Sequence, residues 1–403
     1  MEWKEVRLGD VCTRVCSGGT PKSTNLSYYG GEIPWLNTKE IDFNRIYSTE
    51  KTITDSGLNN SSAKWIVPNT VTVAMYGATA GKSCIVKVPM TTNQACCNLT
   101  INDEVADYEF VYYTLKNDYT TLASLANGGA QQNLNAQIIK DYVLQMPSLA
   151  DQRRIASILS SLDRKIELNN KINADLEEMA QAIFKNWFVD FEPFKGGKFV
   201  DSELGMIPEG WKVGCLGDMG AVVCGKTPSK SNSNYYGGDI PFIKIPDMHG
   251  NVFVENSEDR LTEEGSLSQI KKLIPPYSLM VSCIATVGLV SINTKPSHTN
   301  QQINTVIPHN KSALFYLYQH IKNNEEFLKN MGRGGTTTLN VNTKSFSNIR
   351  LLIPSEIALE QFHGIVEGLF KKIEQNLHES RTLSLLRDTL LPRLMSGELE
   401  VPE

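Results

Sequence analysis

Long apolar runs are missing from this chain of 403 residues. No stretch approaches the roughly 18 consecutive apolar residues that a membrane-spanning helix needs. Residues 1–7 also lack the apolar core of a secretory signal. We therefore expect the protein to stay in the cytoplasm. Its eight cysteines, none of them in a Cys-x-x-Cys pair, should remain reduced there and behave as small buried hydrophobes.

Catalytic and metal-binding motifs are missing as well. None of the six histidines has the H-E-x-x-H spacing of a zinc enzyme. Residues 77–83 are one residue short of a phosphate-binding loop, and no G-x-G-x-x-G follows a strand to hold S-adenosylmethionine. Residues 274–277, Ile-Pro-Pro-Tyr, resemble the Asn/Asp-Pro-Pro-aromatic loop of adenine methyltransferases, but isoleucine replaces its polar residue. We predict no catalytic residues, no metal site and no cofactor bound by this chain.

The chain also lacks a surplus of positive charge. The formal net charge is −5, and the excess of acidic residues is concentrated in residues 355–403. Such a chain gains little from the sequence-independent attraction between basic residues and phosphates. If it binds DNA, we expect other subunits to supply much of the affinity.

What the sequence does contain is an internal repeat. Residues 28–31 (Tyr-Tyr-Gly-Gly) recur as residues 235–238, and residues 92–94 (Thr-Asn-Gln) recur as residues 299–301, both 207 positions later. A period this long indicates a duplicated module rather than a solenoid. Two copies of one module suit a partner that is itself read in two halves, such as duplex DNA.

Each half of the repeat has a mixed globular part followed by a helical part. Short β-favouring runs separated by Gly-rich turns indicate the globular parts, and the first is predicted to contain a helix over about 107–125. We expect a globular domain over 1–147, a central long helix over 148–192, a linker and second globular domain over 193–353, and a C-terminal long helix and tail over 354–403. Ser148 is the predicted N-cap of the first long helix. The fold class is therefore mixed α/β.

The two helical segments have apolar residues at alternating spacings of four and three, which is typical of a coiled coil. Asn169 and Asn376 occupy equivalent places in this pattern, where a polar residue fixes register and partner. The two helices can therefore pair antiparallel; two independent surface helices are the alternative. The residues expected to form the seam and to dock other subunits are Ile155, Leu162, Ile166, Asn169, Leu176, Trp187, Phe362, Leu369, Ile373, Asn376, Leu383 and Leu390.

Side chains suited to reading DNA collect in loops of both globular parts. Asn and Gln match adenine edges, Lys and Arg match guanine, and polar side chains contact phosphates. The candidates in the first domain are Thr20, Lys22, Lys39, Asn93, Gln94, Gln131, Gln132 and Asn133. The candidates in the second domain are Lys226, Thr227, Lys230, Lys244, Asn300, Gln301, Arg333 and Thr336. Such residues are also common in ordinary loops, so it is their duplication that favours a function.

Four stretches resemble the specificity subunits of type I restriction–modification systems. They are residues 134–155 at the junction of globule and helix, 176–193 at the end of the central helix, 202–218 at the start of the second domain, and 390–399 near the C-terminus. The resemblance covers essentially the whole chain. It implies two target-recognition domains separated by two long antiparallel coiled-coil helices, with pseudo-two-fold symmetry.

The resemblance also implies a division of labour. Each domain would read one half of a bipartite, asymmetric site in double-stranded DNA, because the loops after the Gly-Gly turns differ between the two halves. The helices would dock two modification (methyltransferase) subunits, and restriction subunits would join the complex. S-adenosylmethionine, ATP and Mg would be bound by these partners. Two alternatives remain open: a stand-alone enzyme with two related sites, and an assembly scaffold of a related DNA-methylation or defence complex that reads no bases itself.

Overall fold

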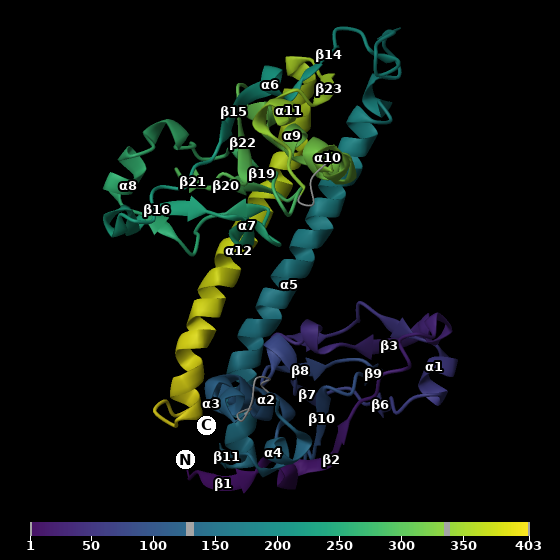
Figure 1. The fold of residues 1–403 in the computed structure, drawn as a ribbon, viewed down its shortest axis with the longest axis vertical. Coiled ribbons are helices and arrows are strands. Elements are labelled where there is room, and N and C mark those ends of the chain that lie inside the picture. Colours follow the sequence, from purple (N-terminus) through teal and green to yellow (C-terminus); the bar gives the residue numbers. More distant parts are fainter. Residues whose placement is uncertain (1, 126–132, 334–338, 402–403) are drawn as a thin grey trace. The chain divides into compact units, whose positions relative to one another are not determined.

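The computed structural model describes residues 2–125, 133–333 and 339–401. The chain forms two compact units, which we call unit 1 (Met1–Ile166 with Arg381–Glu403) and unit 2 (Glu167–Ser380). Each unit contains one globular domain and part of each of two long helices, which Figure 1 draws in teal and yellow. The boundaries predicted from sequence follow the change from globule to helix, whereas the units divide both long helices near their middle. Each globular domain packs tightly against the helix segments beside it, which therefore belong to the same compact unit.

Unit 1 has two main sheets. The first has the order β2 (Cys12–Ser17), β10 (Cys96–Ile101), β7 (Val71–Ala74), β8 (Ser83–Val86) and β4 (Arg45–Ile46). The second has the order β5 (Thr52–Ile53), β3 (Tyr29–Leu36), β9 (Met90–Thr92) and β6 (Trp65–Ile66). A separate pair joins β1 (Lys4–Arg7) to β11 (Val143–Met146). The helices are α1 (Asp55–Asn59), α2 (Tyr108–Asn117), α3 (Tyr119–Ser124) and α4 (Ala136–Asp141), with 3-10 turns η1 (Leu8–Val11), η2 (Leu26–Tyr28), η3 (Thr38–Glu40) and η4 (Gly77–Thr79).

Unit 2 has a similar arrangement. Its first sheet has the order β15 (Gly220–Cys224), β22 (Ile303–Pro308), β19 (Leu279–Ser282), β20 (Val290–Asn293) and β17 (Phe253–Val254). The second has the order β18 (Arg260–Leu261), β16 (Tyr236–Ile243) and β21 (His298–Thr299), and two pairs join β14 (Lys212–Cys215) to β23 (Arg350–Ile353) and β12 (Phe199–Val200) to β13 (Ile207–Pro208). The helices are α6 (Leu216–Met219), α7 (Ile245–Met248), α8 (Glu263–Leu267), α9 (Leu314–Asn323), α10 (Glu325–Gly332) and α11 (Thr343–Ser347), with 3-10 turns η5 (Glu192–Phe194), η6 (Ser233–Tyr235), η7 (Ile270–Lys272) and η8 (Lys311–Ala313).

The repeat in the sequence is a repeat of the fold. The parallel register Trp35↔Thr91 between β3 and β9 recurs as Phe242↔His298 between β16 and β21. The parallel register Arg45↔Ile85 recurs as Phe253↔Ile292. Helices α2 and α9 have ten residues each, so their positions correspond one to one. Lys87 N and Thr294 N donate to the carbonyl oxygens of Ile46 and Val254, and Asn69 N and Tyr277 N donate to those of Val86 and Asn293. Residues that share a rung, a helix position or a backbone hydrogen bond in this way are called equivalent below.

The long helices are α5 (Leu149–Phe188) and α12 (Glu356–Met395), each of 40 residues. At 1.5 Å per residue, each is about 60 Å long. Both helices begin in the same manner, because Ser148 Oγ accepts a hydrogen bond from Asp151 N (3.2 Å) and Ser355 Oγ accepts one from Ala358 N (3.3 Å). Over the residues that the structure describes, neither these helices nor any other is long and apolar enough to cross a membrane.

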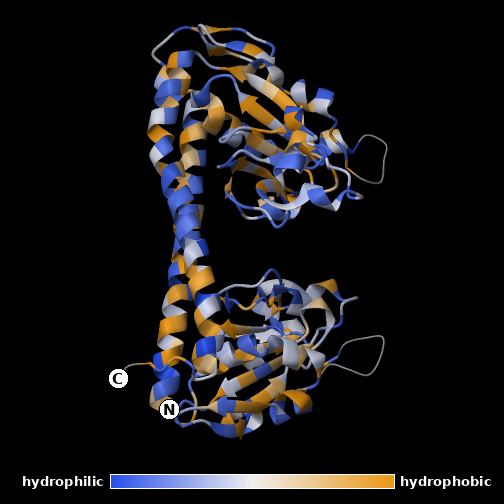
Figure 2. Cartoon of the chain, turned by 90° about the vertical axis from the view of Figure 1, so that its left-hand side faces the viewer, coloured by the Kyte–Doolittle hydropathy of each residue, from blue (hydrophilic) through white to orange (hydrophobic). Residues whose placement is uncertain are grey.

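The two long helices pair antiparallel in both units. In unit 2, Asn376 Nδ2 donates to Asn173 Oδ1 at 2.8 Å, and Asn169 Nδ2 donates to Ser380 Oγ at 3.2 Å. In unit 1, Arg387 Nη1 lies 2.6 Å from Asp163 Oδ1. Early residues of α5 therefore meet late residues of α12, and the middle of both helices is mostly hydrophilic (Figure 2). The predicted mixed α/β class with an antiparallel helix pair is confirmed.

The residues buried along the long helices are not only those expected at the seam of two paired helices. Of the predicted seam residues, the buried ones are Ile155, Asn169, Phe362, Ile373 and Asn376, and the half-buried ones are Leu162, Ile166, Leu176, Trp187, Leu369, Leu383 and Leu390. Phe184, Phe188 and Phe370, which the spacing did not single out, are buried. They lie in the core shared with the globular domain of unit 2. A globule packing from the side widens the apolar stripe beyond the coiled-coil positions.

Candidate nucleic-acid interface

One hydrogen bond joins the same two loops in both units. In unit 1, Thr20 Oγ1 donates to Gln94 Oε1. In unit 2, Thr227 Oγ1 donates to Gln301 Oε1 at 2.5 Å. We call these two contacts the Thr–Gln clamps. The structure thus brings four of the candidate residues together as two equivalent pairs.

Glycines let the clamp loops approach each other. A Cβ on Gly18 would lie 2.2 Å from the carbonyl oxygen of Thr92, and a Cβ on Gly225 would lie 2.1 Å from that of Asn300. Real side chains do not tolerate such contacts, so both positions require glycine. Loops held this closely present their clamp residues in a defined place.

The repeated tyrosines also hold these loops. Tyr29 Oη donates to the carbonyl oxygen of Pro21 at 2.6 Å, and Tyr236 Oη donates to that of Pro228 at 2.8 Å. Both bonds pull the start of the loop towards β3 or β16. The Tyr-Tyr-Gly-Gly repeat is therefore explained in part by loop positioning.

Asn93 and Asn300 are buried rather than presented at the surface. Asn93 Oδ1 accepts hydrogen bonds from Ala95 N (3.0 Å) and Cys96 Sγ (3.2 Å). Asn300 Oδ1 accepts one from Gln302 N at 3.1 Å, and its Nδ2 donates to Gln302 Oε1 at 3.0 Å. Both side chains are committed to the turn that carries the clamp glutamine.

The candidate lysines fall into two groups. Lys39 lies 2.5 Å from Glu50 Oε2, and the hydrogen bond to that carboxylate raises the pKa of Lys39; Lys244 is similarly paired with Asp259. The side chains of the other candidate lysines are exposed and form no ion pair or hydrogen bond within the described ranges: Lys22, Lys226 and Lys230. The second group carries charge that is available to an incoming phosphate.

In each unit, a further segment that contains candidate residues lies beside the turn after β7 or β19. Asn133 forms an isolated β-bridge with Tyr76, and Asn340 forms the corresponding bridge with Ile284. Asn133 and Arg333 are exposed, and Arg333 Nη1 donates to Asn330 Oδ1 at 2.7 Å. The remaining candidates, Gln131, Gln132 and Thr336, lie outside the described residues.

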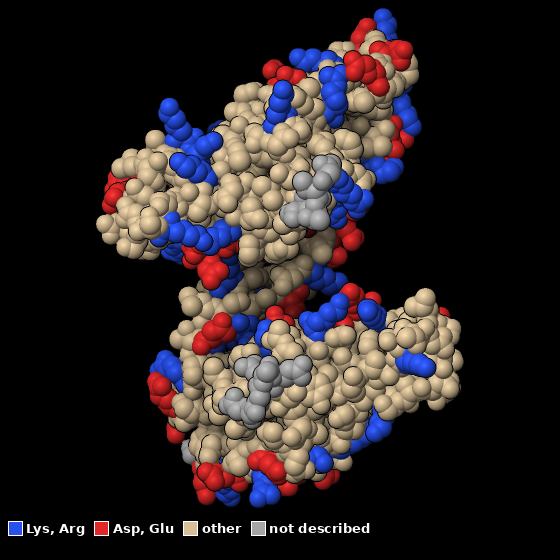
Figure 3. Space-filling view, in the orientation of Figure 1, with Lys and Arg blue, Asp and Glu red and all other residues tan. Residues whose placement is uncertain are grey.

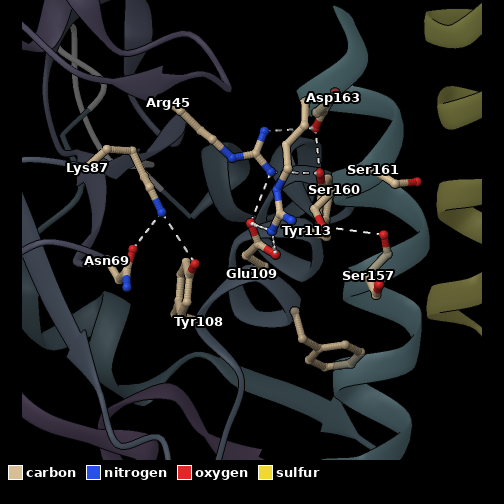
Figure 4. A network of polar contacts seen from close by, with 12 residues as sticks. Arg45, Asn69, Lys87, Tyr108, Glu109, Tyr113, Ser157, Ser160, Ser161 and Asp163 are labelled. Carbon is tan, nitrogen blue, oxygen red and sulfur yellow. Dashed lines mark hydrogen bonds and ion pairs between the residues drawn. The ribbon is translucent and has the colours of Figure 1, made fainter. Parts of the chain in front are cut away.

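A buried ion network fixes the globular domain of unit 1 to the long helices (Figure 4). Arg45 Nη2 from β4 lies 3.2 Å from Glu109 Oε1 of α2, and Arg45 Nη1 lies 3.9 Å from Asp163 Oδ2 of α5. Asp163 also accepts a hydrogen bond from Tyr113 Oη at 2.5 Å. Arg164 Nη2 lies 2.9 Å from Glu109 Oε2. These contacts determine how the domain, and with it the clamp loops, is oriented on α5.

Other kinds of site would depend on the remaining charged and titratable groups in the described part of the chain. Figure 3 shows basic and acidic side chains interspersed over the face drawn, with wide areas of neither. Cys97 is buried, which raises the pKa of its thiol to about 12. Within the described ranges, no group of three or more His, Cys, Asp or Glu side chains could hold a metal ion.

Comparisons with known proteins find relatives along most of this chain. The family model for the type I restriction modification DNA specificity domain matches residues 1–178 and 208–383. The HindI specificity subunit of Haemophilus influenzae is 37% identical over 354 residues, covering 72% of this chain and 77% of that protein. The MjaIX specificity subunit of Methanocaldococcus jannaschii is 30% identical over 417 residues, covering 100% of this chain and 94% of that protein. The crystal structure of a type I restriction–modification S subunit from M. genitalium has a similar fold, with a TM-score of 0.61 at 16% identity, covering 100% of this chain and 97% of that one.

Proposed function

Because this chain belongs to the family of type I restriction–modification specificity subunits, we propose that its two units each read one half of a bipartite, asymmetric DNA site. Specificity subunits recognise DNA and are not themselves catalytic. The family domain occurs twice in the chain, once in each half. The duplicated Thr–Gln clamp is the observation that carries the proposal, because the same polar geometry is built twice from distant parts of the sequence.

The clamp determines what its glutamine can bind. A separation of 2.5 Å between Thr227 Oγ1 and Gln301 Oε1 fits an O–H···O bond and is too short for an N–H···O bond. The amide oxygen therefore already accepts one hydrogen bond within the loop, and the amide N–H groups have no partner in the described part of the chain. Bidentate reading of adenine would need this oxygen to accept a second hydrogen bond, whereas a phosphate needs only the N–H groups. We assign Gln94 and Gln301 to DNA phosphates, which they would contact as donors.

The other candidates then take different roles. Lys22, Lys226 and Lys230 would neutralise phosphates, since no carboxylate competes for them in the described chain. Asn93 and Asn300 would shape the clamp turn without touching bases. Base reading is assigned to the segments that contain Asn133 and Arg333, together with Gln131, Gln132 and Thr336. Because these segments differ between the units, the two half-sites should differ too.

Partner subunits complete the proposed activity. The long helices carry four large apolar side chains that are more than half exposed, namely Leu168 (51%), Met179 (52%), Ile357 (68%) and Leu385 (71%). Exposed apolar residues on such a helix are suited to docking another protein. We propose that two modification subunits bind there and supply S-adenosylmethionine, and that restriction subunits supply ATP and Mg chemistry. The complex would work in the cytoplasm.

Methylation mapping tests this function. The chain is co-expressed with its modification subunits, and methylated adenines are located across the host genome. The expected result is one gapped motif with two unlike half-sites. Absence of any gapped motif, with the complex shown to be assembled, would contradict the proposal.

One observation favours the alternative of a scaffold that reads no bases, namely the net charge of −5. Such a scaffold would assemble with its partners and leave the methylated sequence unchanged when its globular domains are altered. A change in the methylated motif after alteration of residues 1–147 would exclude it.

A further inference from the structure

Unit 2 contains a cavity that the DNA-reading role does not use. Its volume is about 650 Å³, within the range of sites that hold small molecules or side chains. It lies between residues 275–277, the end of β22, the start of α9 and one face of α12. The residues that decide its chemistry are Phe253, Tyr277, Leu314, Phe315, His363 and Glu374.

The equivalent place in unit 1 is filled by the chain's own side chains (Figure 4). Lys87 Nζ donates to Asn69 Oδ1 at 2.6 Å and lies 5.2 Å from the ring centroid of Tyr108. In unit 2 the equivalents of Lys87 and Tyr108 are Thr294 and Leu314, which are shorter. The space opens because these two side chains are lost.

The ion pair beside this place is also lost. Glu109, which binds Arg164 in unit 1, is replaced in unit 2 by Phe315. The equivalent of Arg164 is Lys371, which instead lies 2.8 Å from Glu367 Oε1. The cavity therefore has an aromatic wall where unit 1 has a carboxylate.

Tyr277 at the cavity mouth is strained. Its φ is +59°, and 48% of its surface is exposed. Unit 1 has Asn69 at the equivalent position with φ +67°, a conformation that asparagine tolerates and a bulky side chain rarely adopts. Strain kept at an exposed aromatic residue points to a role in binding.

The polar groups define what the cavity accepts. Lys311 and Lys371 balance Glu367 and Glu374, so an uncharged occupant fits best. Burial lowers the pKa of His363, whose ring is stacked on Phe315 at 5.1 Å. Glu374 accepts only a weak hydrogen bond, 3.4 Å from Tyr277 Oη. A flat ring with an N–H or O–H donor would stack on the aromatic wall and satisfy this carboxylate.

The position of the cavity favours a protein over a nucleobase. Strand β22 starts at Ile303, next to the clamp turn, and ends at Pro308, which lines the cavity. Six strand residues span about 17 Å, so the clamp and the cavity lie at opposite ends of this strand. The cavity wall on α12 belongs to the helix pair on which partner subunits are proposed to dock.

We propose that this cavity receives a tryptophan or tyrosine side chain of a modification subunit, and that unit 1 docks its modification subunit without such an anchor. The inference rests on the proposed function, in which modification subunits bind this chain. The two units would then bind their modification subunits by different contacts, and binding to unit 2 would depend on a single aromatic side chain.

The Tyr277→Asn variant tests this directly, because it introduces the residue found at the equivalent position of unit 1. It removes part of the aromatic wall and relieves the backbone strain, so folding should be unimpaired. Loss of an anchor contact typically costs about 2 kcal/mol, or roughly 30-fold in affinity. Native mass spectrometry of the full chain, titrated with modification subunit, should show one subunit bound where the wild type binds two.

A second variant fills the cavity instead of opening its wall. Leu314→Tyr with Lys371→Arg introduces the side chain types that occupy this place in unit 1, and it should give the same loss of one subunit. Asn69→Ala, the matched control in unit 1, should leave two bound. Wild-type affinity and stoichiometry in both unit 2 variants would overturn the inference. A wild-type chain that binds no modification subunit would instead overturn the proposed function.

Discussion

Where the globular domain meets the long helices, equivalent positions hold Arg45, Glu109 and Asp163 in unit 1 and Phe253, Phe315 and Phe370 in unit 2. In unit 1 these side chains form an ion network with Tyr113 and Arg387. In unit 2, Phe315 and Phe370 stack with ring centroids 4.1 Å apart and an interplanar angle of 6°. Phe253 packs edge-on against Phe370 at 6.3 Å.

The difference shows which parts of the module are interchangeable. Desolvation of buried ions offsets most of their attraction, so an ion network and an apolar cluster of similar volume can stabilise an interface equally well. The clamp loops have the same glycine, threonine and glutamine in both units. The contacts between globular domain and long helices, in contrast, are ionic in unit 1 and aromatic in unit 2. The helix interface therefore needs only good packing, while the clamp needs particular atoms.

Breaking the ion network should have the largest effect. Asp163→Ala leaves Arg45 and Arg387 without their shared carboxylate in a buried place and should destabilise unit 1 by about 3–5 kcal/mol. Phe370→Ala in unit 2 should cost a similar amount through the cavity it leaves. Urea denaturation with hydrogen exchange resolved by unit measures both losses. A loss for Asp163→Ala no larger than that of a surface ion pair, about 1 kcal/mol, would contradict the burial of unpaired charge.

The second largest effect should come from acidification, which should destabilise unit 2 more than unit 1 because all six histidines lie in unit 2. Burial lowers the pKa of His298 to about 4, and its Nε2 lies 2.8 Å from Ser266 Oγ. The folded state therefore binds fewer protons than the unfolded state between about pH 4 and the ordinary histidine pKa of about 6.5. Stability from this group is full above pH 6.5 and is lost as pH falls towards 4.

At pH 5 the loss from His298 alone should be about 2 kcal/mol, since each pKa unit corresponds to about 1.36 kcal/mol. Burial also lowers the pKa of His320 to about 4, so this second histidine of unit 2 should add to the loss. Hydrogen exchange at pH 7 and pH 5 should show it in unit 2. The His298→Gln variant should show less pH dependence over this range. An unchanged pH response in that variant would rule out His298 as the cause.

Exchanging the chemistry of the two interfaces should have a smaller effect. Arg45→Phe, Glu109→Phe and Asp163→Phe combined with Arg387→Ala give unit 1 the residues of unit 2 at four positions, since Ala180 is equivalent to Arg387. Tyr113→Phe is added because its buried hydroxyl would lose the acceptor Asp163. Apolar replacement of a whole buried network is close to neutral or stabilising, so unit 1 should stay within about 2 kcal/mol of the wild type. Thermal denaturation measures this, and loss of folding would show that the two interfaces are not interchangeable.

The smallest effects should come from the clamps. Gln94→Ala and Gln301→Ala each remove one hydrogen bond from a neutral amide to an anionic phosphate, which is worth about 1.5 kcal/mol at an exposed site. Binding of the assembled complex to target and non-target DNA should weaken equally, because a phosphate contact carries no sequence information. A variant that lost discrimination at one half-site would show that its glutamine reads a base.

Much of the fold follows from patterns within the sequence. The offset of 207 residues predicted two equal modules, and Ser148 marked the start of the first long helix. The helix predicted over about 107–125 is confirmed as α2 and α3, with a break at Asp118. These features depend on local spacing and turn residues, which a single sequence displays.

Other features depend on residues far apart in the chain. The network of Arg45, Glu109 and Asp163 joins a strand to two helices, and no spacing marks these residues as partners. Phe370 was missed because it packs on Phe315 and Tyr318 of the globular domain, and the coiled-coil spacing does not mark such a position. Asn93 resembled an exposed DNA-reading residue, but its side chain is needed within the turn. One cue was available, since a repeated Asn-Gln pair in a tight turn can reflect turn geometry as well as recognition.

The most direct measurement replaces residues 1–147 with the corresponding domain of another specificity subunit and maps the methylated adenines. If each unit reads its own half-site, one half of the gapped motif should change while the other half stays as in the wild type. A motif altered in both halves, or in neither, would contradict independent reading by the two units.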